Sequence, residues 1–125
     1  MAKFRQNALC PCGSGKKYKR CCKIFHNGIY PKDVLTLMKS RYSAFAVGEI
    51  DYIIKTSINQ KDYRELKAFS EICDFKRLDI LDYGEDFVIF RATIFCNGED
   101  NSFSERSRFI LVDGKWKYES GEFLD

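Results

Sequence analysis

Four of the six cysteines lie within thirteen residues, in the run C-P-C-G-S-G-K-K-Y-K-R-C-C. They are Cys10, Cys12, Cys21 and Cys22, two close pairs separated by an eight-residue spacer. In a reducing compartment such pairs are better explained as thiolate ligands than as a disulfide framework. Zinc suits them, because it takes four soft ligands tetrahedrally and can organise a short segment that has little apolar surface to bury. The sequence therefore predicts one structural zinc ion on these four cysteines.

His26 is a rival ligand, and it is the only histidine of the chain. It lies four residues past Cys22 and could replace one member of the Cys21 and Cys22 pair, because imidazole is a common zinc ligand. Within the spacer, Gly13 and Gly15 permit turns that point backbone N–H groups at thiolate sulfurs. Residue types alone leave the choice between His26 and a fourth cysteine open.

The positive charge of the chain is concentrated around the same cysteines. Residues 1–25 have a net charge of +7 and contain no acid, whereas the remainder has a net charge of −4. Lys16, Lys17, Lys19 and Arg20 are interleaved with Tyr18, a pattern that predicts phosphate contacts with one stacking ring. The alternative is that these cations only balance the −2 charge of a zinc ion with four thiolates and keep the segment soluble.

The cysteine spacing and the intervening G-S-G-K-K-Y-K resemble the SEC-C motif, a zinc module found at the C-terminus of the translocation ATPase SecA and in many other proteins. In that family the positions that match Cys10, Cys12, Cys21 and Cys22 bind zinc, with His or Cys at the last, so the resemblance favours Cys22 over His26. The module of SecA contacts the chaperone SecB and the ribosome. The resemblance thus implies an adaptor whose basic module contacts an acidic protein or a ribosome/RNA partner.

Downstream of this segment, apolar periodicity predicts helices followed by strands. A helical period runs from Asp33, which is placed to cap it, to Gly48, which ends it. Two shorter helices are predicted at 50–58 and 61–70. From there the period changes to two, which predicts strands at 75–83, 86–96, 102–112 and 115–122. Helices followed by a meander of antiparallel strands define an α+β fold.

Asp113-Gly114 is a strong signal for a two-residue hairpin, and it sets a register. Counting back from the turn pairs Leu111 with Trp116, Ile110 with Lys117, Phe109 with Tyr118, Arg108 with Glu119, and Ser107 with Ser120. Glu105 then shares the face that receives the helices. Arg41 lies on the apolar face of the first long helix, and we predict that it pairs with Glu105.

The runs L-M-K-S-R-Y-S-A-F-A-V-G-E-I-D-Y-I (37–53) and E-R-S-R-F-I-L-V-D-G-K-W-K-Y (105–118) resemble the YchJ-like family. That family joins a SEC-C motif to a nuclear-transport-factor-2-like, or cystatin-like, domain. The resemblance implies a zinc module at 1–28 and a domain at 29–125 with helices on a curved antiparallel sheet. Domains of this superfamily often dimerise through the sheet, so both a homodimer and a monomer stay open.

A curved sheet wrapped on helices leaves a cone whose mouth can hold a ligand. The residues that the sequence offers for such a pocket are Arg41, Tyr42, Glu105, Trp116 and Tyr118. Small-molecule binding or catalysis in this cone is the alternative to the adaptor function. No acid/base dyad emerges, so no catalytic residue is assigned.

The composition is that of a globular protein, with 45% apolar and 31% charged residues over 125 positions. No apolar run approaches the length needed to cross a bilayer, and the first residues lack the apolar stretch of a signal peptide. We therefore expect a cytoplasmic protein. Cys73, at a helix-to-strand junction, and Cys96, which alternates with apolar residues, are expected to be structural, Cys96 as a small buried apolar residue.

Overall fold

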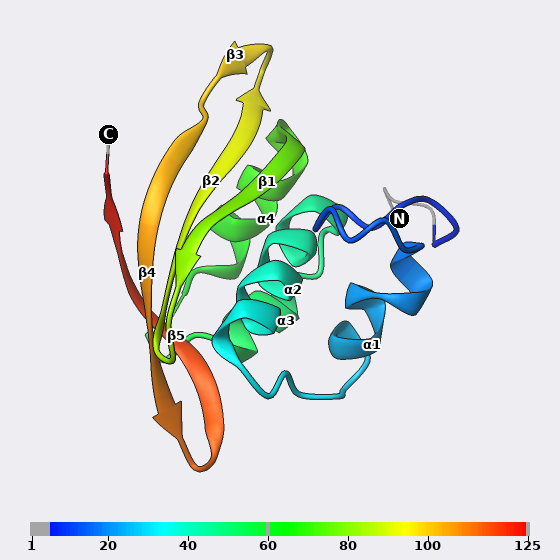
Figure 1. Ribbon diagram of the computed structural model, residues 1–125. Coiled ribbons are helices and arrows are strands. Elements are labelled where there is room, and N and C mark those ends of the chain that lie inside the picture. The colour runs from blue at the N-terminus through cyan, green and yellow to red at the C-terminus, as the bar shows by residue number, and fades with distance from the viewer. Residues whose placement is uncertain (1–5, 60, 125) are drawn as a thin grey trace.

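The structure is a computed structural model that describes residues 6–59 and 61–124. Its elements in chain order are the 3₁₀-helix η1 (Tyr18–Arg20), the helices α1 (Cys22–His26), α2 (Val34–Val47), α3 (Ile50–Lys55) and α4 (Tyr63–Ile72), and the strands β1 (Cys73–Tyr83), β2 (Phe87–Cys96), β3 (Glu99–Asp100), β4 (Phe103–Val112) and β5 (Lys115–Phe123). The predicted α+β class is confirmed. Helices α2, α3 and α4 cover the concave face of a curved sheet, and the N-terminal segment packs against the far side of α2 (Figure 1).

Helix α2 begins and ends where the sequence predicts. The Asp33 carboxylate accepts a hydrogen bond of 2.8 Å from the Thr36 N–H, which satisfies one of the free donors of the first turn. Gly48 ends the helix in the left-handed conformation with φ of 85°, which is unfavourable for residues with a Cβ. The buried side of α2 contributes Leu37 and Met38 to the core with β2 and β4.

The helix predicted at 50–58 is shorter than expected, because its last residues pair with the sheet. The N–H of Tyr118 in β5 donates to the Thr56 carbonyl at 2.8 Å, and the N–H of Ile58 donates to the Tyr118 carbonyl at 3.0 Å. Residues 56–58 therefore cover the outer edge of β5 instead of continuing α3, which protects an otherwise open strand edge.

The sheet is antiparallel with the strand order β1-β2-β4-β5, and β3 pairs with β2. The hairpin register predicted from Asp113-Gly114 is confirmed from Val112 as far as Phe109, which pairs with Tyr118. Beyond that pair a bulge shifts the register by one residue, so that the predicted partners for Arg108 and Ser107 are wrong. The observed partners are Arg108 with Ser120, Ser107 with Gly121, and Glu105 with Phe123.

The two isolated cysteines are joined to each other, which corrects the interpretation of Cys96 as a simple apolar residue. Cys73 and Cys96 form a disulfide between the start of β1 and the end of β2, where they are register partners. Their separation of 23 residues in the chain concealed the pairing from sequence inspection. None of the helices in the described ranges is long and apolar enough to cross a membrane.

Candidate metal centre and cone cavity

The structure brings the four N-terminal cysteines into one cluster. Their Sγ atoms all lie within 4.8 Å of one another, and those of Cys12 and Cys21 are 3.6 Å apart. Four thiolates bound tetrahedrally at about 2.3 Å would place neighbouring sulfurs roughly 3.8 Å apart. Cys10, Cys12 and Cys22 are buried, and Cys21 is partly exposed. The donor set and its spacing fit a zinc ion.

Backbone turns of the spacer hold the cluster in this arrangement. Gly13 and Gly15 adopt positive φ angles of 86° and 85°, as the two turns require. The N–H of Cys10 donates to the Lys16 carbonyl at 2.8 Å, which closes the loop between the two cysteine pairs. The second pair follows at once, with Cys22 as the first residue of α1.

Two serine hydroxyls contact the sulfurs. The Ser14 Oγ lies 3.1 Å from the Cys21 Sγ within the spacer, and the Ser43 Oγ lies 3.5 Å from the Cys10 Sγ. Ser43 is a fully buried residue of α2, so the sulfur cluster is attached to the main domain through this contact. Hydroxyl donors of this kind stabilise thiolate ligands and fix their orientation.

The sulfurs of the cluster also affect one another's protonation. Hydrogen bonds from the thiols of Cys12 and Cys22 lower the pKa of Cys10, whereas the bond to Cys10 raises the pKa of Cys22. One thiolate therefore disfavours the next when the four sulfurs are packed together without a positive charge. A divalent cation removes this conflict, because it stabilises all four thiolates at once.

His26, the rival ligand, does not join the cluster. Its Nε2 lies 2.8 Å from the Ser40 carbonyl, which can only accept, so Nε2 carries the proton. Its Nδ1 lies 2.7 Å from the Tyr18 hydroxyl and accepts from it. Burial lowers the pKa of His26, in agreement with this neutral form. Both nitrogens are thus engaged: Nδ1 bonds within the N-terminal segment, and Nε2 joins that segment to α2.

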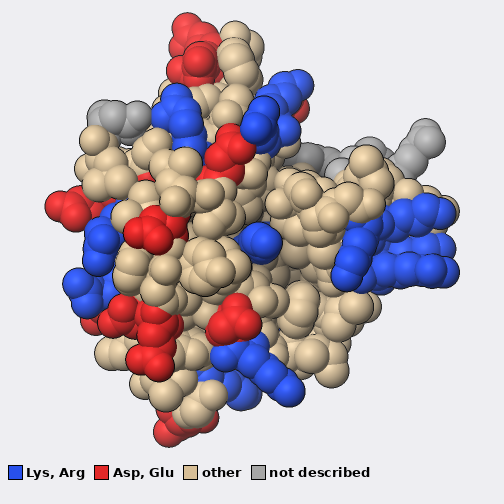
Figure 2. All heavy atoms as spheres, in the orientation of Figure 1, with Lys and Arg blue, Asp and Glu red and all other residues tan. Residues whose placement is uncertain are grey.

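The basic residues of the spacer are exposed, but Tyr18 is not available for stacking. Figure 2 shows lysine and arginine side chains gathered on the side of the molecule where the N-terminal segment lies in Figure 1. Lys16, Lys17, Lys19 and Arg20 are all exposed. Tyr18 is 5% exposed and faces inward to His26, so the prediction that its ring stacks on a base is wrong. Lys3 and Arg5, which add to the predicted charge, lie outside the described residues.

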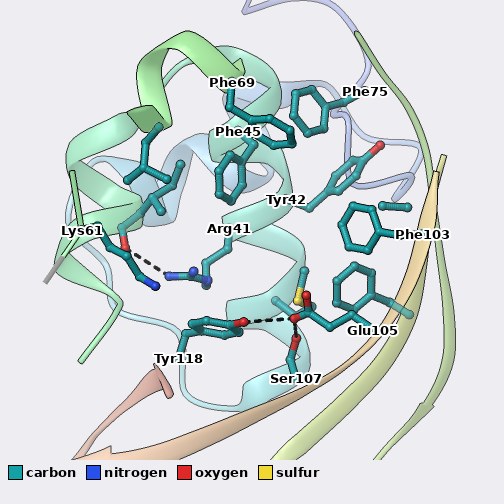
Figure 3. A pocket seen from close by; sticks show the side chains of 15 residues that line it. Arg41, Tyr42, Phe45, Lys61, Phe69, Phe75, Phe103, Glu105, Ser107 and Tyr118 are labelled. Atoms are coloured by element: carbon teal, nitrogen blue, oxygen red, sulfur yellow. Dashed lines mark hydrogen bonds between the residues drawn. The ribbon is translucent and has the colours of Figure 1, made fainter. Parts of the chain in front are cut away.

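A cavity of about 220 Å³ opens between α2, α4 and the concave face of the sheet (Figure 3). Four of the five predicted pocket residues line it, namely Arg41, Tyr42, Glu105 and Tyr118. Trp116 lies outside it, close to the Asp113-Gly114 turn. Its carbonyl accepts a hydrogen bond of 2.6 Å from the Tyr30 hydroxyl.

The predicted ion pair between Arg41 and Glu105 is absent, which corrects the sequence analysis. The Arg41 Nη1 donates to three oxygens at the end of α3: the Ile53 carbonyl at 3.1 Å, the Thr56 Oγ1 at 2.7 Å and the Ser57 Oγ at 3.0 Å. These acceptors became available because α3 ends before residue 56, which the periodicity did not indicate.

The Glu105 carboxylate is held by hydroxyl groups instead. Its Oε2 accepts from the Ser107 hydroxyl at 2.6 Å and from the Tyr118 hydroxyl at 3.1 Å. Sequence reasoning missed Ser107, although its position two residues from Glu105 on the same strand face was a usable signal. It also missed Lys61, which lines the cavity from the segment before α4 and carries no pattern that would single it out.

Taken together, a four-cysteine cluster in an N-terminal module and a helix-covered curved sheet define the class: a SEC-C motif joined to an NTF2-like domain. Comparison with known families agrees, since the family described as "YchJ, middle NTF2-like domain" matches residues 33–121 and the SEC-C motif matches residues 7–23. The chain belongs to this YchJ-like family.

Similar proteins and a solved structure extend over nearly the whole chain. A UPF0225 protein of Vibrio parahaemolyticus is 40% identical over 91% of this chain and 74% of its own length. A UPF0225 protein of Streptomyces coelicolor is 34% identical over 93% of this chain and 96% of its own. The solution structure of a SEC-C motif-containing protein from Rhodopseudomonas palustris matches with a TM-score of 0.80, at 32% identity over 93% of this chain and 98% of that one.

Proposed function

We propose that this protein is a zinc-dependent adaptor of the cytoplasm whose N-terminal module binds the phosphates of RNA, as on a ribosomal surface. The observation that carries the proposal is the placement of Lys16, Lys17, Lys19 and Arg20. All four are exposed on the loop between the two cysteine pairs. In the described part of the chain the one recorded ion pair is between Arg77 and Asp79, so these four cations remain available to a polyanion.

The metal contributes to this function by fixing the loop that carries the cations. The ends of the loop are tied by the Cys10 N–H to Lys16 carbonyl bond and by the sulfur cluster itself. A preorganised loop loses less conformational entropy when it binds than a free one does. Zinc is therefore needed for tight RNA binding although it touches no nucleotide.

The inward position of Tyr18 sets the expected specificity. Sequence-selective recognition of single-stranded RNA relies largely on bases stacked on exposed aromatic rings. The Tyr18 ring is buried against His26 and cannot stack on a base, so the four cations serve mainly as phosphate contacts. We therefore expect binding that is strong in low salt and indifferent to base sequence.

Fluorescence anisotropy with two labelled single-stranded RNAs of unrelated sequence tests the proposal. With four phosphate contacts, the logarithm of the binding constant should fall against the logarithm of salt concentration with a slope of about −3. Changing Lys16, Lys17, Lys19 and Arg20 to Gln should abolish binding. A matched control changes four exposed lysines elsewhere to Gln: Lys32, Lys55, Lys67 and Lys115.

The control variant should retain most of the affinity, because it has the same net charge as the test variant but an intact basic loop. Equal losses in the two variants would overturn the proposal, since they would reflect net charge alone. Polyglutamate that competes as well as RNA at equal charge would also overturn it and would favour an acidic protein as the partner.

A further inference from the structure

The cavity under the sheet has one charged end and one aromatic end. The proposed RNA-binding function does not account for this asymmetry. Figure 3 shows Arg41 and Lys61 beside Tyr118 on one side, with Phe45, Phe69 and Phe75 on another. The aromatic side is tightly built, since the Phe69 and Phe75 rings meet edge to face with centroids 5.7 Å apart. An apolar wall with a few convergent polar groups is the usual form of a small-molecule site.

Arg41 is a buried cation with no direct ion-pair partner among the residues that the structure describes. The residue is only 5% exposed. Its three hydrogen bonds are all donated by Nη1, and all three acceptors are uncharged oxygens. Its guanidinium carbon lies 4.5 Å from the centre of the Tyr118 ring, which offers a partial negative face and no full charge. Burial lowers the pKa of Arg41 to about 10, so the group stays protonated at neutral pH.

The carboxylate in the cavity offsets this cation only at a distance, where its charge raises the pKa of Arg41. Glu105 forms no ion pair with Arg41 and directs its Oε2 to the hydroxyls of Ser107 and Tyr118. Lys61 supplies a second cation at the same end, with its Nζ 5.6 Å from the centre of the Tyr118 ring. Two cations and one carboxylate give the cavity a net charge of +1, which a ligand with a single negative charge balances.

The size of the cavity limits the ligand. Its volume of about 220 Å³ is below the roughly 300–1,000 Å³ typical of pockets for drug-sized molecules. A planar carboxylate matches the fork of an Arg side chain better than other small anions of the same charge. The remaining space lies among phenylalanine rings and accepts an apolar body.

We infer that the cone of this protein binds a compact monocarboxylate with an apolar body, with its carboxylate on the free edge of Arg41 and its body among the phenylalanine rings. Arg41 is the anchor, and Lys61 attracts the anion at the mouth. Ala92 and Phe103 on the sheet line the apolar part.

Isothermal titration calorimetry of the full, zinc-loaded chain with phenylacetate and with phenylacetamide tests this inference. The two probes have nearly the same shape and differ in charge. Phenylacetate should bind at least about tenfold more tightly than the amide, because only the anion compensates the buried guanidinium. Hexanoate should also bind, whereas equal affinities for acid and amide, or no binding of either acid at 10 mM, would overturn the inference.

Three variants locate the binding. Arg41→Met should abolish the preference for the acid over the amide, and Lys61→Gln should weaken phenylacetate binding severalfold. Ala92→Leu should fill the cavity and exclude both probes, and it does not touch the charged end. The control is Lys67→Gln on the exposed side of α4, which should leave binding unchanged. Undiminished binding to both Arg41→Met and Ala92→Leu would place the ligand elsewhere and contradict the inference, whatever the outcome of the RNA experiment.

Discussion

The imidazole of His26 donates a hydrogen bond of 2.8 Å to the backbone carbonyl of Ser40, in the middle of α2. On its other side the same ring accepts from the buried Tyr18 hydroxyl at 2.7 Å. The single histidine of the chain is therefore a clamp between the cysteine module and the main domain, beside the contact of Ser43 with Cys10. This position explains how a basic loop at the N-terminus can be held rigidly on a domain whose core lies elsewhere.

Replacing His26 by Ala should lower the free energy of unfolding by about 3 kcal/mol, because a buried hydroxyl and a buried carbonyl lose their partner. The change should leave zinc content at one ion per chain, since His26 does not contact the sulfur cluster. Urea denaturation and metal analysis of the purified variant measure the two effects. Loss of the metal together with unchanged stability would show that the ring serves the cluster.

The clamp also predicts a pH dependence. Burial lowers the pKa of His26 in the folded protein, so its contribution to stability is complete above the unfolded pKa of about 6.5. As the pH falls from there to the folded pKa, stability should decrease by up to about 1.4 kcal/mol per pH unit. His26→Gln is the matched control, because an amide can donate and accept without titrating. Parallel curves for parent and variant between pH 7 and 6 would refute the assignment.

Ser43→Ala should weaken zinc retention about tenfold, because groups that hold a metal ligand in place typically contribute this much or more. The Ser43 Oγ lies 3.5 Å from the Cys10 Sγ, and its removal leaves that sulfur without its contact from α2. Competition with a chromophoric chelator measures the affinity. Ser107→Ala, a change of a buried serine on β4, is the control and should have no effect on the metal.

Arg41→Met should change the free energy of unfolding by less than about 1 kcal/mol, because replacing an uncompensated buried charge by an apolar side chain is often neutral or stabilising. The acceptors of Arg41 keep other partners: the Thr56 hydroxyl bonds the Tyr52 carbonyl at 2.7 Å, and the Ser57 hydroxyl bonds the Ile53 carbonyl at 2.8 Å. Thermal and chemical denaturation check this. A loss of 3 kcal/mol or more would contradict this and would mean that the hydrogen bonds of Arg41 to the end of α3 are a major source of stability.

The disulfide between Cys73 and Cys96 should stabilise the oxidised protein by about 3 kcal/mol, because it closes a loop between residues 23 positions apart in the unfolded chain. The parent and a Cys73→Ala, Cys96→Ala double variant should differ by this amount without reductant and converge in a phosphine reductant. Equal stabilities under oxidising conditions would show that the two thiols stay unpaired in solution.

The sequence predicted the parts of this molecule that local chemistry determines. The spacing of the cysteines from Cys10 to Cys22 predicted the sulfur cluster, and Asp113-Gly114 predicted the strand pairing as far as Phe109. The sequence-based prediction was wrong where the strand register depends on a contact with a distant segment of the chain. The bulge after Phe109 occurs where residues 56–58 hydrogen-bond to β5, and no periodicity in β5 itself encodes that contact.

The wrong predictions for two polar residues, Tyr18 and Arg41, also come from contacts between segments that are distant in the chain. Tyr18 is interleaved with lysines and therefore looked exposed, but the partner that holds it inward, His26, is supplied by a later turn of the chain. Arg41 was expected to need an acid, and it found neutral oxygens at a helix end instead. Burial depends on the partners that the fold brings near, which residue type and spacing alone do not specify.

X-ray absorption at the zinc edge, on protein purified without added metal, tests the central claim most directly. The account predicts one zinc ion per chain surrounded by four sulfurs at about 2.3 Å, with no nitrogen in the first coordination sphere. The spectrum should be the same for His26→Gln and should lose sulfur scatterers in Cys21→Ser. A shell of three sulfurs and one nitrogen, or a protein free of zinc, would contradict it.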